Sequence, residues 1–135
     1  MTKETTLYNY QGFVDSVTSE PSKDLETFIA RLRELDQSGV NVPRFITGGI
    51  GMADESGEFA GYVKKVLFHG KPLNEENIVA LRKELGDVLW YWANACTSLG
   101  FDPYEIIQEN IEKLESRYPG GFSAWLSENR KPEDI

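Results

Sequence analysis

The chain has 135 residues, a length that suits one domain with a hydrophobic core of its own. Its 22 acidic residues outnumber the 14 basic ones, and a net charge of -8 argues against binding a nucleic-acid backbone, which requires a basic surface. We also expect neither a membrane span nor a signal peptide, because no apolar stretch is long enough. The single cysteine, Cys96, excludes an internal disulfide and fits a reducing cytoplasm.

The first half of the chain predicts three helices in succession. Apolar residues recur at helical spacing from Leu7 to Val17 and again from Leu25 to Leu35. Gly39 is expected to end the second helix, because glycine readily adopts the left-handed conformation of a helix C-terminus. A third and longer helix is expected from about Pro43 to Phe68.

The second half predicts two more helices and a short turn. Asn74 is a predicted N-cap for a helix that runs to Thr97 and ends at Gly100. Asp102 is expected to cap the next helix, which runs to about Arg117 and has a proline at its first position. After Pro119-Gly120-Gly121 we expect a short turn over residues 122–126. The pattern therefore predicts a single all-α domain over 1–128, a bundle of about four to five helices, followed by a polar tail at 129–135.

Two acidic pairs with the same spacing lie inside the two longest predicted helices. Glu55 and Glu58 form the first pair, and Glu84 and Asp87 form the second. Carboxylates three residues apart share one helix face. If the two helices pack antiparallel, the four carboxylates converge on one spot, and such a group of oxygen ligands suits a hard cation.

The neighbours of these pairs distinguish them from ordinary surface acids. Glu109, Glu112 and Glu115 have the same spacing, and a solvated helix face is the simpler interpretation there. The pairs of the long helices are instead flanked by apolar or aromatic side chains: Met52, Phe59, Tyr62, Leu81, Val88 and Tyr91. A carboxylate on such a face is costly unless a cation or hydrogen-bond donors compensate it.

Glycines are frequent on the same two helices, although each weakens a helix by up to about 1 kcal/mol. We expect Gly57 and Gly86 to allow close packing of the helix backbones. For the segment from Gly48 to Gly51, a frayed or kinked start of the helix is an alternative interpretation.

These motifs carry a resemblance to a known family. The run from Gly51 to Glu58, followed by Glu84-Leu-Gly-Asp87, resembles the Glu-x-x-Glu plus Glu-x-x-Asp signature of MazG-like nucleotide pyrophosphohydrolases. Residues 110–119 are similar to the closing helix of that family, and the resemblance covers roughly residues 46–122. Where the family often has two glutamates, this chain has Asp54 before Glu55, and we expect Asp54 to point away from the metals.

The resemblance implies an activity as well as a fold. Members cleave nucleoside triphosphates to a monophosphate and pyrophosphate with Mg²⁺ or Mn²⁺, and the bundle assembles as a homodimer or homotetramer. By resemblance, Glu55, Glu58, Glu84 and Asp87 bind the metal and carry catalysis. Small stand-alone versions are common in phages and bacteria, which implies nucleotide-pool control in a bacterial or host cytoplasm.

The resemblance also assigns substrate contacts. Lys113 and Arg117 lie one helical turn apart and so face the same direction, where without the resemblance they would be a solvated surface row. With it, they clamp phosphate oxygens, and Asn110 adds an amide on the same face. Gln11, in a weaker match near the start of the chain, is a candidate for contacting the base.

Three functions stay open from the sequence. A general nucleoside triphosphate pyrophosphohydrolase is the first, and a dUTP or phosphoribosyl-ATP pyrophosphohydrolase of the same superfamily is the second. A catalytically silent nucleotide-binding or regulatory protein is the third. The preferred base, the group that activates water and the number of metal ions are not determined by these residues.

The aromatic run from Trp90 to Trp92 predicts contact with a second subunit. Trp90 and Trp92 point to helix faces about 160° apart, and one layer of helices would struggle to cover both. One ring of this run is also a candidate for stacking on a nucleobase.

Overall fold

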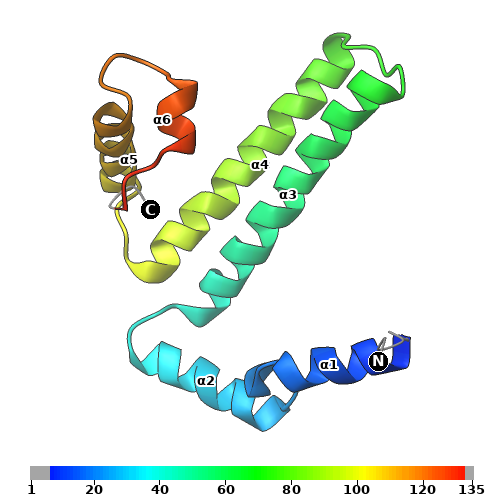
Figure 1. Ribbon diagram of the computed structural model, residues 1–135, viewed down its shortest axis with the longest axis vertical. Coiled ribbons are helices and arrows are strands. Elements are labelled where there is room, and N and C mark those ends of the chain that lie inside the picture. The colour runs from blue at the N-terminus through cyan, green and yellow to red at the C-terminus, as the bar shows by residue number, and fades with distance from the viewer. Residues whose placement is uncertain (1–6, 133–135) are drawn as a thin grey trace, which may run out of the picture. The chain divides into compact units, whose positions relative to one another are not determined.

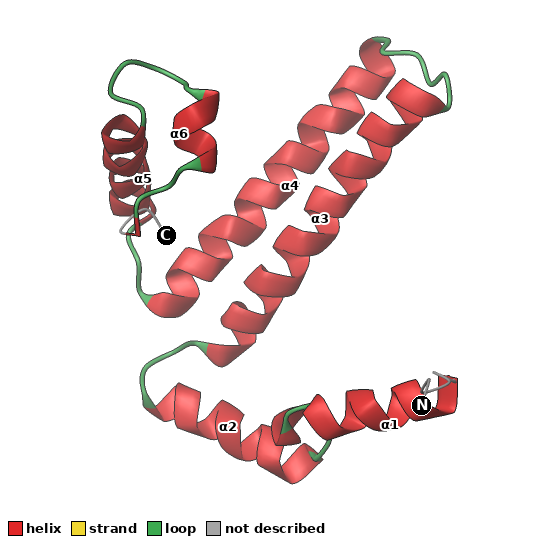
Figure 2. Ribbon diagram, viewed as in Figure 1, coloured by secondary structure: helices red, strands yellow, loops and turns green. Residues whose placement is uncertain are grey.

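The structure, a computed structural model, describes residues 7–132, which form helices joined by loops and turns, without a β-strand (Figures 1 and 2). The prediction of an all-α fold is therefore confirmed. The elements are α1 (Leu7–Val17), the 3-10 helix η1 (Glu20–Ser22), α2 (Leu25–Gln37), α3 (Val42–Phe68), α4 (Glu75–Leu99), α5 (Pro103–Arg117) and α6 (Ala124–Glu128). None of these helices is long and apolar enough to cross a membrane.

The predicted helix ends are found where the sequence placed them. The side chain of Asn74 accepts a hydrogen bond from the Asn77 N–H, and that of Asp102 accepts one from the Tyr104 N–H. Gly100 ends α4 with a φ of 70°, in the left-handed region that glycine adopts at little cost. The structure shows one further cap that was not predicted. The Asp24 carboxylate accepts a 2.7 Å hydrogen bond from the Thr27 N–H and so begins α2.

The chain divides into two compact units, Met1–Val42 and Pro43–Ile135. In the first unit, α1, η1 and α2 are joined partly through Lys23. Its ammonium group donates to the Asp15 carbonyl at 3.3 Å and pairs with the Glu20 carboxylate at 3.3 Å. The single domain over 1–128 and the separate tail at 129–135 stay predictions.

In the second unit, α3 and α4 form an antiparallel hairpin (Figure 1). The two backbones approach each other most closely at two glycines of α3. A Cβ atom built on Gly48 would lie 2.8 Å from the backbone nitrogen of Ala95, and one built on Gly51 would overlap the ring of Tyr91. Only glycine allows α4 to come this close at these two positions.

Two expectations about the glycines are therefore wrong. The segment from Gly48 to Gly51 is not a frayed helix start, because α3 begins at Val42, continues through it and packs on α4 there. Conversely, a Cβ atom at Gly57 or Gly86 would meet no atom within 4 Å, so these two residues do not serve helix packing within the chain. The backbone approach lies about one to two turns away from the acidic pairs.

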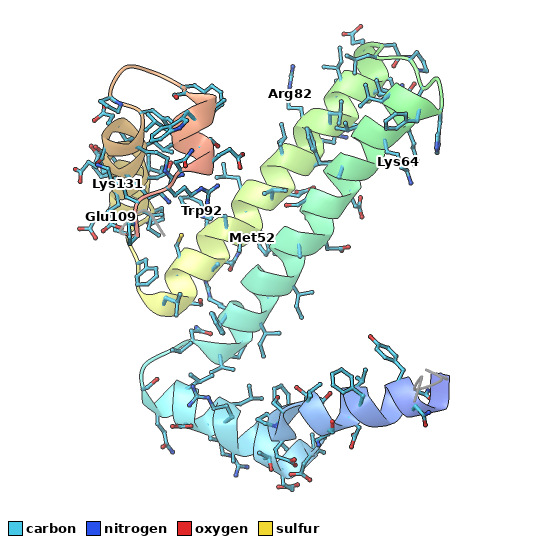
Figure 3. All side chains as sticks on the ribbon, in the orientation of Figure 1. Met52, Lys64, Arg82, Trp92, Glu109 and Lys131 are labelled. Carbon is cyan, nitrogen blue, oxygen red and sulfur yellow. The ribbon has the colours of Figure 1, made fainter. Side chains whose placement is uncertain are left out.

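Few apolar side chains are buried within one chain. Among the described residues, only Val42 and Cys96 are buried hydrophobic side chains. Trp90 is 57% exposed, whereas Trp92 is half-buried and lines an apolar pocket of about 410 Å³ with Met52 and Ile107. Figure 3 shows Met52 on α3 and Trp92 on the adjacent α4. Much of the apolar surface is thus left open to solvent in the single chain.

Candidate metal centre

Three carboxylates from the two helices of the hairpin come together. Glu55 and Glu58 project from α3 and Glu84 from α4, and one oxygen of each lies within 4.8 Å of the others. Two features of the sequence produce this arrangement. The spacing of three residues aligns Glu55 with Glu58 on one face, and the antiparallel hairpin brings Glu84 opposite them.

Asp87, the fourth predicted ligand, lies at the edge of this group. It is exposed and is not among the three carboxylates that share the 4.8 Å sphere. Its charge nevertheless contributes to the raised pKa of Glu55. Asp87 is therefore close enough to act on the group electrostatically, and its role as a metal ligand stays a prediction.

The electrostatics of the group disfavour its negative charge. The pKa of Glu55 is raised above its ordinary value of 4.5, first by partial loss of hydration and then by repulsion from nearby carboxylates. In decreasing order, the repelling residues are Glu58, Asp87, Glu84 and Asp54. A bound cation would remove this repulsion, since it stabilises the ionised form of every carboxylate around it.

The geometry of the group fits a hard divalent cation. Mg²⁺ binds oxygen at about 2.0–2.1 Å, so two ligands on opposite sides of the ion lie roughly 4.2 Å apart. Oxygens within 4.8 Å of one another reach that spacing through small side-chain rotations. All three donors are carboxylates, and Mg²⁺ and Mn²⁺ favour such oxygen ligands over nitrogen or sulfur.

The predicted phosphate clamp lies on a different helix. Asn110 and Lys113 line a pocket of about 220 Å³ together with Ile106 and Glu109, all of them on α5. Arg117, one turn further along, is half-buried, and its guanidinium carbon lies 5.9 Å from the centroid of the Tyr118 ring. The three predicted clamp residues therefore follow one another along α5, and none of them belongs to the carboxylate group.

Gln11 belongs to the first unit of the chain, whereas the other predicted site residues belong to the second. It lies on α1 in the first unit, where its side chain is exposed. Its contact with a base stays a prediction, as do the roles of Asn110, Lys113 and Arg117.

A pocket that the sequence did not predict adjoins the carboxylate group. It has a volume of about 490 Å³ and lies between Tyr62 of α3 and one face of α4 that ends at Glu84. One signal was present in the sequence, because Tyr62 follows Glu58 by four residues and Glu55 by seven, which places all three on one face of a helix.

Comparison with known proteins identifies the family. Residues 49–122, more than half of the chain, match the MazG nucleotide pyrophosphohydrolase domain. The chain belongs to the MazG nucleotide pyrophosphohydrolase family. The gene 37 protein of Mycobacterium phage L5 is 37% identical over 82 residues, which are 60% of this chain and 72% of the phage protein. No solved structure matches the chain.

The MazG match includes most of the predicted site. Glu55, Glu58, Glu84 and Asp87 all lie within residues 49–122, and so do the three clamp residues of α5. Gln11, together with α1 and α2, lies outside that range. The MazG domain thus corresponds to the second unit of the chain, where the carboxylates meet.

Proposed function

We propose that this MazG-family protein is a metal-dependent nucleoside triphosphate pyrophosphohydrolase that acts in nucleotide-pool control. It cleaves a ribo- or deoxyribonucleoside triphosphate to the monophosphate and pyrophosphate. The observation that carries the proposal is the convergence of Glu55, Glu58 and Glu84 from two helices within 4.8 Å. Carboxylates placed so closely repel one another unless a cation lies between them.

Each residue has a defined role in this proposal. Glu55, Glu58, Glu84 and Asp87 hold Mg²⁺, for which Mn²⁺ can substitute. When bound there, the ion would supply positive charge that offsets the charge of the phosphate chain and so favours attack of water on phosphorus. The carboxylates would position the phosphates only through the ion, and either one of the carboxylates or a hydroxide held by the ion would position the attacking water.

The departing phosphates need donors, and the carboxylates offer none. We assign this role to Lys113 and Arg117, whose charged groups donate to phosphate oxygens, with the Asn110 amide beside them. In support, Asn110 and Lys113 line one pocket on α5. This helix acts either in its own chain or on the carboxylate group of a partner chain.

We further propose that the protein works as a homodimer or homotetramer in the cytoplasm. Soluble monomers rarely leave large apolar patches exposed, whereas Leu89 is 60% exposed and Trp90 57% exposed on consecutive positions of α4. A second chain packed on this surface would remove it from water. A reducing cytoplasm is compatible with the free thiol of Cys96.

Two isosteric variants test the proposal. Glu58→Gln and Asp87→Asn keep the size of each side chain but remove a charge that holds the cation. We expect the Mg²⁺-dependent release of pyrophosphate from deoxynucleoside triphosphates to fall at least about 100-fold, since the lost ligand removes several kcal/mol of charge stabilisation. The helical circular dichroism signal should stay unchanged.

A matched control comes from α5. Glu112→Gln makes the same chemical change on an exposed helix face, and we expect nearly wild-type turnover. If Glu58→Gln or Asp87→Asn hydrolysed triphosphates at the wild-type rate with Mg²⁺, the assignment of the carboxylates would be wrong.

A further inference from the structure

The pocket beside Glu84 has two chemically different walls. On the α3 side lies the half-buried ring of Tyr62. On the α4 side lie the aliphatic side chains of Val79 and Ala80, flanked by the charged side chains of Glu75, Glu76, Lys83 and Glu84. Its volume of about 490 Å³ is within the range of ordinary small-molecule sites. A slot between an aromatic face and an aliphatic wall suits a flat, largely apolar ring.

Hydrogen bonds hold the turn between α3 and α4, although none of residues 69–74 lines the pocket. Gly70, with a φ of 66°, reverses the chain after α3, and the Lys71 N–H donates to the Lys65 carbonyl at 3.1 Å. The buried side chain of Asn77 donates to the Pro72 carbonyl at 2.8 Å and so ties the same turn to α4. These bonds fix the connection between the two helices that line the pocket.

Two lysines place their ammonium groups near the tyrosine, Lys71 from the turn and Lys65 from α3 itself. The ammonium groups of Lys71 and Lys65 lie 5.3 Å and 5.9 Å from the centroid of the Tyr62 ring. Cations at this distance are attracted by the face of an aromatic ring and restrict its orientation. The ring is thus oriented before any ligand binds, which lowers the cost of stacking against it.

The distance from the pocket to the carboxylates matches the dimensions of a nucleotide. Glu84 belongs both to the lining of the pocket and to the carboxylate group. Along α3, Tyr62 lies four residues beyond Glu58, a rise of about 6 Å. In a nucleotide, the ribose separates the base from the first phosphate by a comparable span, so the phosphates can reach the carboxylates while the base occupies the pocket.

We propose that this pocket binds the nucleobase of the substrate, stacked on the ring of Tyr62. The proposal rests on the proposed pyrophosphohydrolase function and adds the position of the base to it. Tyr62 is then a residue that positions the substrate and contributes to its affinity, while the carboxylates hold the phosphate end. The acidic side chains of Glu75 and Glu76 at the rim belong to the first turn of α4, where they also complement the helix dipole.

Calorimetric titration with two ligands tests this division of the site. A deoxynucleoside monophosphate carries the base, whereas inorganic pyrophosphate does not, and both are titrated in the presence of Mg²⁺. Tyr62→Leu removes the ring but keeps an apolar side chain of similar reach. We expect it to weaken monophosphate binding at least about fivefold, the lower end of what stacking contributes, and to leave pyrophosphate binding unchanged.

Two comparison variants sharpen the experiment. Tyr62→Phe keeps the ring, so it should bind the monophosphate like the wild type. Tyr104→Leu makes the same substitution as Tyr62→Leu at a tyrosine of α5 that is 67% exposed, and it should change neither affinity. Val79→Phe fills the pocket from the α4 side, so it should also weaken the binding of the monophosphate and leave the binding of pyrophosphate unchanged. This second variant keeps the test decisive if Tyr62→Leu folds poorly.

The outcomes separate this inference from the function on which it rests. If the wild type binds both ligands and neither Tyr62→Leu nor Val79→Phe lowers the affinity for the monophosphate, the base does not occupy this pocket. The proposed function would still stand. Equal weakening of both ligands would also overturn the inference, because the ring would then act through the carboxylate end. A wild type that binds neither ligand with Mg²⁺ would contradict the proposed function itself.

Discussion

At the scale of single residues, the carboxyl group of Glu55 is in an environment that disfavours its charge. Partial loss of hydration and repulsion from four neighbouring carboxylates raise its pKa above 4.5. Without a compensating ligand, this clustering lowers the stability of the folded chain. The arrangement is explained if a cation resides there during function, since the same carboxylates then become its ligands.

The raised pKa of Glu55 predicts how stability depends on pH in the absence of metal. The folded chain holds the Glu55 proton more tightly than the unfolded chain, whose pKa is near 4.5. Stability therefore decreases as the pH rises from about that value through the raised folded pKa, and the loss persists at neutral pH. We expect Glu55→Gln to abolish this contribution and to unfold at a higher temperature than the wild type at pH 7 in EDTA.

Addition of Mg²⁺ should reverse the order of the two proteins. An ion that binds only the folded state stabilises it by about 2.7 kcal/mol at 100 times its dissociation constant, and the variant has lost one ligand. Thermal unfolding followed by circular dichroism measures both effects. Identical pH dependence of the wild type and Glu55→Gln, with no response to Mg²⁺ in either, would contradict the role of Glu55.

The acidic residues of the site could be found from the sequence because helical spacing alone determines which side chains share a face. Glu55, Glu58 and Glu84 were predicted in this way, and the structure brings them together. Tyr62 was not singled out as part of a site, although it lies on the same face as Glu55. A pocket depends on the opposite wall and on the turn that closes it, and neither is encoded in the spacing along one helix.

At the scale of elements, side-chain caps and glycines decide where these helices begin, end and meet. Asn74, Asp102 and Gly100 were predictable because a cap acts on backbone groups two to four residues away. The glycines were not, since their role depends on which residue of another helix lies opposite. Gly48 and Gly51 allow α4 to approach, whereas Gly57 meets no atom of the chain within 4 Å.

This difference predicts opposite effects of two alanine substitutions on α3. In Gly48→Ala, the new methyl group lies 2.8 Å from the backbone of Ala95, which cannot rotate away. We expect a loss of about 1–3 kcal/mol in the free energy of unfolding, as for other overpacked sites. In Gly57→Ala, the methyl group has room, and the higher helix propensity of alanine should add up to about 1 kcal/mol.

Urea-induced unfolding of the two glycine variants gives both values under the same conditions. Equal changes in the two variants would show that the close approach at Gly48 does not hold the hairpin together.

At the scale of the whole molecule, the apolar residues have more surface than one chain covers. The sequence requires burial of a set that includes Leu25, Phe28, Leu89, Trp90 and Phe101, and all five stay exposed in the single chain. The all-α class followed from local periodicity, since each helix is specified by its own residues. The burial of the apolar side chains could not be predicted in the same way, because it depends on how helices of one or more chains associate.

Oligomer formation is the corresponding prediction. We expect sedimentation at micromolar concentration to give at least a dimer, and Trp90→Glu to weaken the association at least about tenfold, since a buried tryptophan in an interface often contributes 2 kcal/mol or more. Trp90 is the more informative position for this test, because it is exposed in the single chain, whereas Trp92 lines an apolar pocket of its own chain. A well-folded and fully active monomer would refute the prediction.

The most direct test of the central claim is the identity of the products formed from a deoxynucleoside triphosphate. The protein is incubated with each of the four common deoxynucleoside triphosphates and Mg²⁺, without added pyrophosphatase. The products are separated by anion-exchange chromatography. We predict monophosphate and pyrophosphate in equal amounts from at least one substrate, and none when EDTA removes the metal. Release of orthophosphate with a nucleoside diphosphate, or undiminished turnover in EDTA, would contradict a metal-dependent pyrophosphohydrolase.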